Sequence, residues 1–300
     1  MAKRLLVTGG GGFVGGWVVA LAGGDWALHA TRRTPAPNGR ADAVWHTLDL
    51  SDAERLADTL RAVRPTAVVH AAAMADIDRC EQQPELAERV NVGVTAEIAR
   101  YCADSGARLV LLSTDTVFDG RRGMYREDDP PQPVNVYGGT KVRAEQAVAT
   151  TLPGAAIVRL SLVMGLPILE RGNSFLARML DAWREGKPVR VPSDEVRTPV
   201  DVVTLARAIL ELASGGTAGI VHVAGNDRLP RDEMARRIAR RLGVDESLVL
   251  PTSGATPGRA PRPRDVSLDN ARARRILQTP MLGLEEGLDL ALSTRRGEER

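Results

Sequence analysis

Short apolar runs alternate with amphipathic stretches over the first 160 residues. Six of these runs predict strands, at residues 4–7, 26–31, 44–48, 67–70, 109–112 and 156–160. The stretches between them have a helical period and predict helices at 13–22, 52–63, 84–104 and 137–151. This alternation of strand and helix favours an α/β fold in which a doubly wound, Rossmann-type parallel sheet is covered by helices.

The alternation of strand and helix becomes less regular after residue 165. Helices are expected near 174–183, 202–213 and 231–242, and strands around Val189 and at 219–223. The Pro- and Arg-rich residues 251–264 predict a loop, and the charged tail 293–300 is expected to fray. We therefore expect a Rossmann domain at residues 1–165 and a smaller mixed α/β lobe at 166–300. Within the latter, residues 195–225 or so are expected to return to the Rossmann core.

Composition narrows the classes of protein. The net charge of +2 and the 3% aromatic content argue against a nucleic-acid partner. The sequence contains neither an 18-residue apolar run nor a signal-peptide pattern, so we expect no membrane partner and a cytoplasmic location. The four histidines are scattered over predicted strands without ligand spacing, and no metal site is expected.

A glycine-rich segment follows the first predicted strand and opens the first helix. Gly9, Gly12 and Gly15 stand three residues apart, with Phe13 and Val14 between the last two. Such glycines allow a sharp turn and a close approach to a pyrophosphate, and the helix N-terminus offers unpaired N–H donors. The segment predicts a dinucleotide site.

The end of the second strand distinguishes between dinucleotides. An acidic residue there would pair with the ribose hydroxyls of NAD, whereas arginine accepts the 2′-phosphate of NADP. The strand ends in Thr31-Arg32-Arg33, 20 residues beyond Gly12 and without a carboxylate. The pattern favours NADP(H) as the cofactor, with an idle surface pair as the alternative.

A phenol and an ammonium follow at helical spacing. Tyr137 and Lys141 are four residues apart and therefore share one face of a helix. Only three of the 40 basic residues are lysine, so an ammonium has been kept where arginine is the usual choice. A nearby cation favours the phenolate and so adapts a phenol for proton exchange with a substrate oxygen. A hydroxyl from the end of the 109–112 strand would complete the site, and spacing leaves Ser113, Thr114 and Thr116 as candidates.

These motifs together resemble the extended short-chain dehydrogenase/reductases and, within them, the dTDP-4-dehydrorhamnose reductases. The similarity covers nearly the whole length. The general motifs are the three glycines, Asp49-Leu50, His70 to Ala73, and Tyr137 with Lys141. More specific stretches are residues 71–91, 113–120 with 125–127, 133–137, 197–199 with 205–206, and 262–269. Thr116 and the loop 161–167 depart from the usual pattern, which bears on the sugar pocket.

The resemblance implies a set of site residues. It implies a catalytic triad of Thr114, Tyr137 and Lys141, with Asn91 as a supporting polar residue. Cofactor contacts would come from Gly9, Gly12, Phe13, Val14, Gly15, Arg32, Arg33, Asp49, Leu50, Ala71, Ala72, Ala73, Tyr137 and Lys141. Candidates for substrate binding are Asp119, Asn173, Arg197 and Arg262.

The implied activity is NADPH-dependent reduction of a 4-keto nucleotide-sugar. Hydride would reach the keto carbon while Tyr137 delivers a proton, Thr114 polarises the carbonyl and Lys141 holds the nicotinamide ribose. The expected partner is a nucleotide-sugar, with a dTDP-linked 4-keto-6-deoxyhexose favoured, and a homodimer is a possible assembly. Two alternatives remain: a sugar-nucleotide epimerase or dehydratase, and a non-catalytic NADP-binding regulatory subunit, since the family also resembles the regulatory subunit of methionine adenosyltransferase.

Overall fold

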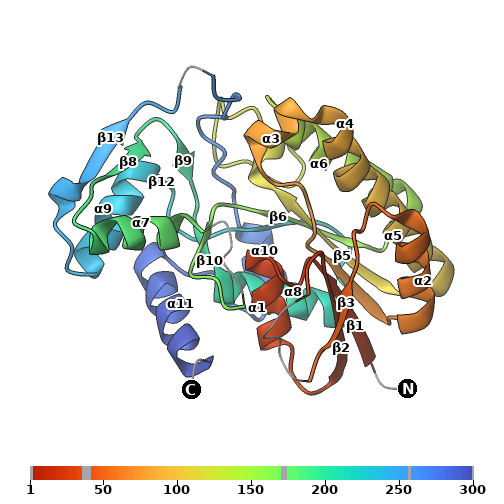
Figure 1. Ribbon diagram of the computed structural model, residues 1–300. Helices are drawn as coiled ribbons and strands as arrows, with labels where there is room; N and C mark the ends of the chain where they lie inside the picture. The colour runs from red at the N-terminus through yellow and green to blue at the C-terminus, as the bar shows by residue number, and fades with distance from the viewer. Residues whose placement is uncertain (1–2, 36–41, 170–173, 256–257, 299–300) are drawn as a thin grey trace.

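A parallel sheet forms the centre of the molecule (Figure 1). The computed structural model describes residues 3–35, 42–169, 174–255 and 258–298. Its seven-stranded sheet has the order β11-β6-β5-β4-β1-β2-β3, and every neighbouring pair is parallel. The strands are β1 (Lys3–Thr8), β2 (Trp26–Arg32), β3 (Val44–Thr47), β4 (Ala67–His70), β5 (Arg108–Thr114), β6 (Ala156–Leu160) and β11 (Gly219–Val223). The predicted Rossmann-type α/β fold is confirmed.

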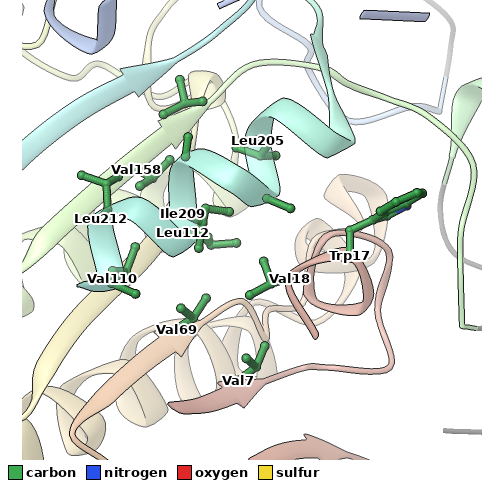
Figure 2. Close-up of a cluster of buried hydrophobic side chains, with 14 of the residues drawn as sticks. Val7, Trp17, Val18, Val69, Val110, Leu112, Val158, Leu205, Ile209 and Leu212 are labelled. Atoms are coloured by element: carbon green, nitrogen blue, oxygen red, sulfur yellow. The ribbon is translucent and has the colours of Figure 1, made fainter. Parts of the chain in front are cut away.

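Successive strand residues point to opposite faces of the sheet, and each face has its own helical cover. Leu5 and Val7 pack on one side, where α1 (Phe13–Leu21) and α8 (Val202–Ser214) contact each other. Leu6 packs on the other side, which is covered by α2 (Ala53–Val63), α5 (Val94–Ser105) and α6 (Val136–Thr151). Figure 2 shows the first of these clusters, with Ile209 and Leu212 of α8 above Val110 of the sheet. Strands buried on both faces explain the continuous apolar runs of the sequence.

Short polar side chains fix where the helices begin. Asp52 accepts a hydrogen bond from the Arg55 amide at the start of α2. Asn135 accepts one from the Gly138 amide, at 2.8 Å, at the start of α6. Both are N-caps, which satisfy an amide that has no partner inside the helix.

The region predicted as one helix at 84–104 is more complex. A short helix, α3 (Ile77–Gln82), precedes it, and the helix itself consists of α4 (Pro84–Glu88), a π-helical turn η1 (Arg89–Gly93) and α5. A π turn inserts one extra residue into the helix, a local change that apolar periodicity does not reveal.

The C-terminal lobe has a core of its own. Its regular elements are α7 (Phe175–Arg184), β8 (Val189–Pro192), α9 (Arg231–Arg241), the 3₁₀ turn η3 (Glu246–Leu248), β13 (Val249–Thr252) and α11 (Leu284–Glu298). β8 and β13 form a parallel pair, and Trp183, Ile238 and Leu288 meet in the core. Two further ladders pair β7 (Val163–Met164) with β10 (Val200–Asp201) and β9 (Val196–Arg197) with β12 (Leu229–Pro230).

The chain passes between the two regions more than once. α8 and β11 pack with the central sheet, and α10 (Ala271–Ile276) lies beside β11. Trp17 of α1, which is fully buried, donates its indole N–H to the Leu166 carbonyl at 2.8 Å. This bond ties the first helix to the start of the C-terminal lobe, and the domain boundary near residue 165 stays a prediction.

One expectation for the C-terminal part was wrong, because the tail is helical as far as Glu298. The region expected as a loop at 251–264 includes the last two residues of β13, and its other described residues form the expected loop. The helix α11 forms because Leu284, Leu288 and Ala291 are buried against the lobe, so tertiary packing outweighs the charged surface composition. Within the described ranges, no helix has the length and apolarity needed to span a membrane.

The core of α8 allows a test of the fold. Ile209 is completely buried, so Ile209→Ala is expected to lower the free energy of unfolding by about 2–5 kcal/mol through lost apolar contacts and a residual cavity. Val44→Ala, at a side chain that is 52% exposed, should change it by no more than about 0.5 kcal/mol. Urea unfolding followed by circular dichroism gives both values. Equal midpoints for the two variants would contradict this packing.

Candidate active site

The glycine loop lies where the strand order reverses. The chain proceeds from β1 outward to β3 and then returns to β4 on the other side of β1, which leaves a crevice at the carboxyl ends of these strands. Gly9 has φ +68°, and a Cβ on it would come within 2.9 Å of Ala72. A Cβ on Gly15 would lie 2.2 Å from the Gly9 carbonyl oxygen. Only glycine fits either position, so the loop packs tightly against the segment after β4.

The first helix presents its N-terminus at this crevice. Gly12 is the N-cap of α1, and no side chain caps the helix there. Phe13 and Val14 follow as the first helical residues, both half-buried, and the first turn carries no acidic residue. An uncapped N-terminus without a carboxylate favours a bound anion.

The two arginines after β2 differ in their surroundings. Arg32 is buried, and its guanidinium carbon lies 4.8 Å from the centroid of the Trp45 ring. Arg33 is exposed. Hydrogen bonds from Ser51 lower the pKa of Asp49, and the charge of Arg33 lowers it further. Arg33 and Asp49 thus face the same region of the crevice rim, and Arg33 is the guanidinium more accessible to a ligand.

The remaining residues expected at the cofactor lie on the same edge. Leu50 is half-buried beside Asp49. Ala71, Ala72 and Ala73 follow β4 directly, and the Ala72 amide donates to the Thr8 hydroxyl at 3.3 Å. The Thr8 hydroxyl in turn is 2.7 Å from Nδ1 of His70, so the ends of β1 and β4 are joined through side chains.

The three candidate hydroxyls at the end of β5 have different hydrogen-bond partners. The Ser113 hydroxyl donates to Glu145 and is buried among structural partners. Thr114, the last residue of β5, accepts a hydrogen bond from the Thr116 amide at 3.1 Å, and the two threonine hydroxyls are 2.9 Å apart. This arrangement starts the 3₁₀ turn η2 (Asp115–Val117). Of the three, Thr114 is the one whose hydroxyl is also a partner of Tyr137.

Tyr137 stands in the first turn of α6, half-buried above this strand end. Burial, and then the negative charge of Asp115, raise the pKa of its phenol, while a side-chain hydrogen bond with Thr114 opposes the rise. The close packing depends on Gly138, where a Cβ would lie 2.4 Å from the Thr116 carbonyl oxygen. The phenol therefore keeps its proton at neutral pH in the cofactor-free chain.

Lys141 is one turn further along α6 and is only 2% exposed. Burial lowers the pKa of its ammonium to about 8, against an opposing effect of Glu145. Among the described residues, none lies within hydrogen-bonding or ion-pairing distance of its Nζ. An ammonium that is buried without a protein partner lowers the stability of the fold, so this group is suited to an external hydrogen-bond acceptor.

Asn91 connects the π turn η1 to helix α6. Its side-chain amide donates to the Thr140 hydroxyl at 3.0 Å and to the Met74 carbonyl, and its oxygen accepts from the Met74 amide at 2.8 Å. These bonds use the side chain fully and link α6 to the loop after β4. The structure thus places Asn91 in contact with α6, and its expected supporting role stays a prediction.

Of the four expected substrate residues, three are engaged with the protein itself. Asp119 accepts from the Tyr125 phenol and from the Arg121 amide. The Arg197 guanidinium, which is 8% exposed, donates to three backbone carbonyls and faces Glu195 and Asp115.

Arg262 makes an ion pair with Asp78 of α3, at 2.7 Å. Asn173 lies outside the described residues. The substrate roles of these four residues stay predictions.

Sequence reasoning missed a buried ion pair next to the site. Glu145 and Arg159 meet at 2.7 Å, with side chains that are 6% and 2% exposed. Two signals were present: a carboxylate four residues after Lys141 on the same helix face, and a charged residue inside the apolar strand 156–160. The close packing of Gly138 was also missed, although two adjacent glycines in the first turn of a helix are a sign of close packing.

Comparisons with known proteins agree with this geometry. The family model described as RmlD substrate binding domain matches residues 3–296. A probable low-salt glycan biosynthesis reductase, Agl14, from Haloferax volcanii is 32% identical over 94% of this chain and 95% of its own. The dTDP-4-dehydrorhamnose reductase of Mycolicibacterium smegmatis is 31% identical over 98% and 86%.

Two further likenesses bear on function. The methionine adenosyltransferase 2 subunit beta of Pongo abelii is 30% identical over 95% of this chain and 87% of its own. The crystal structure of dTDP-4-dehydrorhamnose reductase from Bacillus anthracis, a complex with NADP, superposes with a TM-score of 0.84 at 27% identity, covering 98% of this chain and all of that one. Because the family model spans nearly the entire sequence and the relatives align end to end, the chain belongs to the RmlD substrate binding domain family.

Proposed function

We propose that the chain is an NADPH-dependent reductase of the keto group of a nucleotide-linked sugar. The observation that carries the proposal is the hydrogen bond between Tyr137 and Thr114, one helical turn of α6 before the buried Lys141, whose ammonium has no hydrogen-bond or ion-pair partner among the described residues. A proton donor, a carbonyl-binding hydroxyl and a buried cation are together the groups that carbonyl reduction requires. The reductases among the relatives support the same reading.

The residues at the crevice fit a dinucleotide. The uncapped start of α1 and the tight turn at Gly9 would hold its pyrophosphate, and Lys141 would bond its ribose hydroxyls. Arg33 would face the 2′-phosphate that distinguishes NADPH from NADH. NADPH supplies a hydride when it is bound, and the complex of the Bacillus anthracis relative with NADP supports this choice.

Tyr137 would deliver the proton. Its raised pKa keeps the phenol protonated until an alkoxide develops beside it, and the phenol O–H bond then breaks as the alcohol O–H bond forms. The phenolate regains a proton from solvent. Thr114 would hold the keto oxygen, since its hydroxyl shares the strand end with Tyr137. The neighbours that shift the Tyr137 pKa in the cofactor-free chain are Asp115, Thr114 and Cys80, so tuning by Lys141 stays a prediction.

The C-terminal lobe offers a cationic pocket for the nucleotide part of the substrate. This pocket, of about 220 Å³, lies between α7, β8 and α9 and is lined by Arg178, Arg190 and Arg231 together with apolar Phe175 and Met179. Burial, and then the charge of Arg231, lower the pKa of Arg178. Arg231 is also paired with Glu195 at 3.0 Å, so part of this positive charge is balanced within the protein. Three guanidinium groups around one pocket still favour an anionic ligand such as a pyrophosphate. We propose a nucleoside diphosphate sugar, with a dTDP-linked 4-keto-6-deoxyhexose as the first candidate.

A regulatory subunit is the second candidate function, because methionine adenosyltransferase 2 subunit beta is 30% identical. A chain that only binds NADP has no need of a phenol paired with a strand-end hydroxyl. Epimerases and dehydratases share this arrangement, but they recycle a bound dinucleotide and therefore consume no added NADPH. The three functions thus predict different outcomes in one assay.

Purified protein should oxidise NADPH when supplied with a dTDP-4-keto-6-deoxy sugar, and a UDP-linked 4-keto sugar should serve less well. The loss of NADPH absorbance measures turnover, and mass spectrometry identifies the reduced sugar. Silence across a panel of 4-keto nucleotide-sugars, with NADPH binding intact, would favour the regulatory function. Conversion of the sugar without NADPH loss would favour the epimerase or dehydratase class.

Tyr137→Phe should lower kcat by about a hundredfold or more while NADPH affinity stays close to that of the unaltered chain, because only the transferred proton is removed. Titration of cofactor fluorescence measures the affinity. Tyr101→Phe, at a half-buried tyrosine of α5, is the matched control and should leave kcat unchanged. Full activity of Tyr137→Phe would exclude the proposed proton donor.

Arg33→Ala should raise the Kd for NADPH by about ten- to a hundredfold and leave the Kd for NADH unchanged, since a charge-assisted contact with the 2′-phosphate is lost. Arg61→Ala removes an exposed arginine that pairs with Asp58 on α2 and serves as the control. An equal loss of affinity for both dinucleotides would show that Arg33 does not read the phosphate.

A further inference from the structure

Glu145 is a buried carboxylate that the proposed reaction does not use. It is 5% exposed, and its carboxylate accepts hydrogen bonds from two residues. Arg159 donates from Nε at 3.1 and 3.2 Å and from Nη2 at 2.7 Å, and the Ser113 hydroxyl donates to the same carboxylate. This bidentate arginine–carboxylate pair fixes the relative orientation of the two side chains as well as the distance between them.

These contacts join the catalytic helix to two strand ends. Ser113 of β5 and Arg159 of β6 are register partners, so their side chains leave the sheet side by side toward α6. Glu145 thus holds α6 against the strand residue next to Thr114. We call Ser113, Glu145 and Arg159 the clamp.

Glu145 also faces Lys141, which lies one helical turn before it on the same side of α6. The carboxylate raises the pKa of the Lys141 ammonium, although burial is the larger effect and brings it down to about 8. The other ionisable groups around this pair are Arg159, His70 and His222. Burial lowers the pKa of both histidines to about 3, so they are neutral at working pH.

We propose that Glu145 is a positioning residue of the reductase: the clamp fixes α6 against the ends of β5 and β6, and its carboxylate keeps the Lys141 ammonium charged within the protein. Removing the Glu145 charge therefore alters the protonation of Lys141 without replacing any residue that is proposed to contact substrate or cofactor. The inference rests on the proposed function for its effect on turnover. Its effect on the ammonium can be measured in the cofactor-free chain.

The chain has only three lysines, which makes this measurement direct. In protein labelled with carbon-13 at lysine Cε, NMR signals are expected from Lys141 and from the exposed Lys3 and Lys187, which serve as references. In the unaltered chain the Lys141 signal should titrate with a pKa of about 8. In Glu145→Gln, the midpoint should move down by about one pH unit, because an opposite charge that favoured the ammonium is gone.

Turnover should follow the same shift. As pH rises through the Lys141 midpoint the ammonium is lost, so the alkaline limb of the kcat profile should move to lower pH by about one unit in Glu145→Gln. Glu145→Asp keeps the charge but shortens the clamp, and should lower kcat while leaving the limb in place. Glu88→Gln is the control. Glu88 of α4 forms a half-exposed ion pair with Arg143 of α6, and its loss should change neither kcat nor the position of the alkaline limb.

The buried Arg159 is left without its counter-charge in Glu145→Gln, so a double variant, Glu145→Gln with Arg159→Gln, protects the test against misfolding. Circular dichroism confirms folding, and the downward shift of the Lys141 midpoint should persist. An unchanged midpoint in folded Glu145→Gln or in the double variant would overturn the inference, whatever the activity. A shifted midpoint in a chain that reduces no keto sugar would leave the charge effect established and reject the proposed function instead.

Discussion

The site is organised around one unfavourable placement, the burial of a single ammonium. Lys141 is 2% exposed, and no described residue makes a hydrogen bond or ion pair with its Nζ. Removing an ammonium from water costs several kcal/mol after relaxation, and the fold must supply that energy from contacts elsewhere. Two apolar clusters, one on each face of the sheet, provide it. The buried ammonium is consistent with a site that is complete only when a polar ligand enters.

Helix α6 carries Tyr137 and Lys141, the two ionisable members of the proposed triad, so the proposed chemistry depends on where this helix lies. At its start, the Asn135 cap and the missing side chain of Gly138 let the first turn approach the Thr116 carbonyl. One turn later, Asn91 in the π turn holds Thr140 at 3.0 Å. The extra residue of a π turn redirects the side chains around it, which is one reason such turns recur at functional sites. Contacts on several sides therefore leave α6 little freedom to shift.

Local patterns in the sequence were sufficient to predict most of the sheet and the helical spacing of Tyr137 and Lys141, while the catalytic roles of these residues stay predictions. The β11 prediction matches the structure because a buried parallel strand is a continuous apolar run, and Tyr137 and Lys141 share a face because helical spacing dictates it. The choice among Ser113, Thr114 and Thr116 could not be made from spacing. The choice depends on the tertiary packing of β5 against α6, in which the Ser113 hydroxyl donates a hydrogen bond to Glu145, 32 residues away in the sequence. The helix α11 was missed for a similar reason, since its apolar face acquires a partner only in the folded lobe.

The substrate lobe shows why arginine is a poor guide to ligand contacts in this chain. Since 37 of its 40 basic residues are arginine, the residue type alone does not distinguish structural from binding roles. Arg197 and Arg262, both singled out by motif, donate to backbone carbonyls and carboxylates of the protein. Arg178 and Arg231, which no motif indicated, line one pocket because α7 and α9 both pack on β8, and Arg231 also pairs with Glu195. The proposed catalytic pair is therefore visible in the sequence at the scale of one helical turn, whereas the proposed substrate pocket depends on contacts between segments some 50 residues apart, which no local pattern reveals.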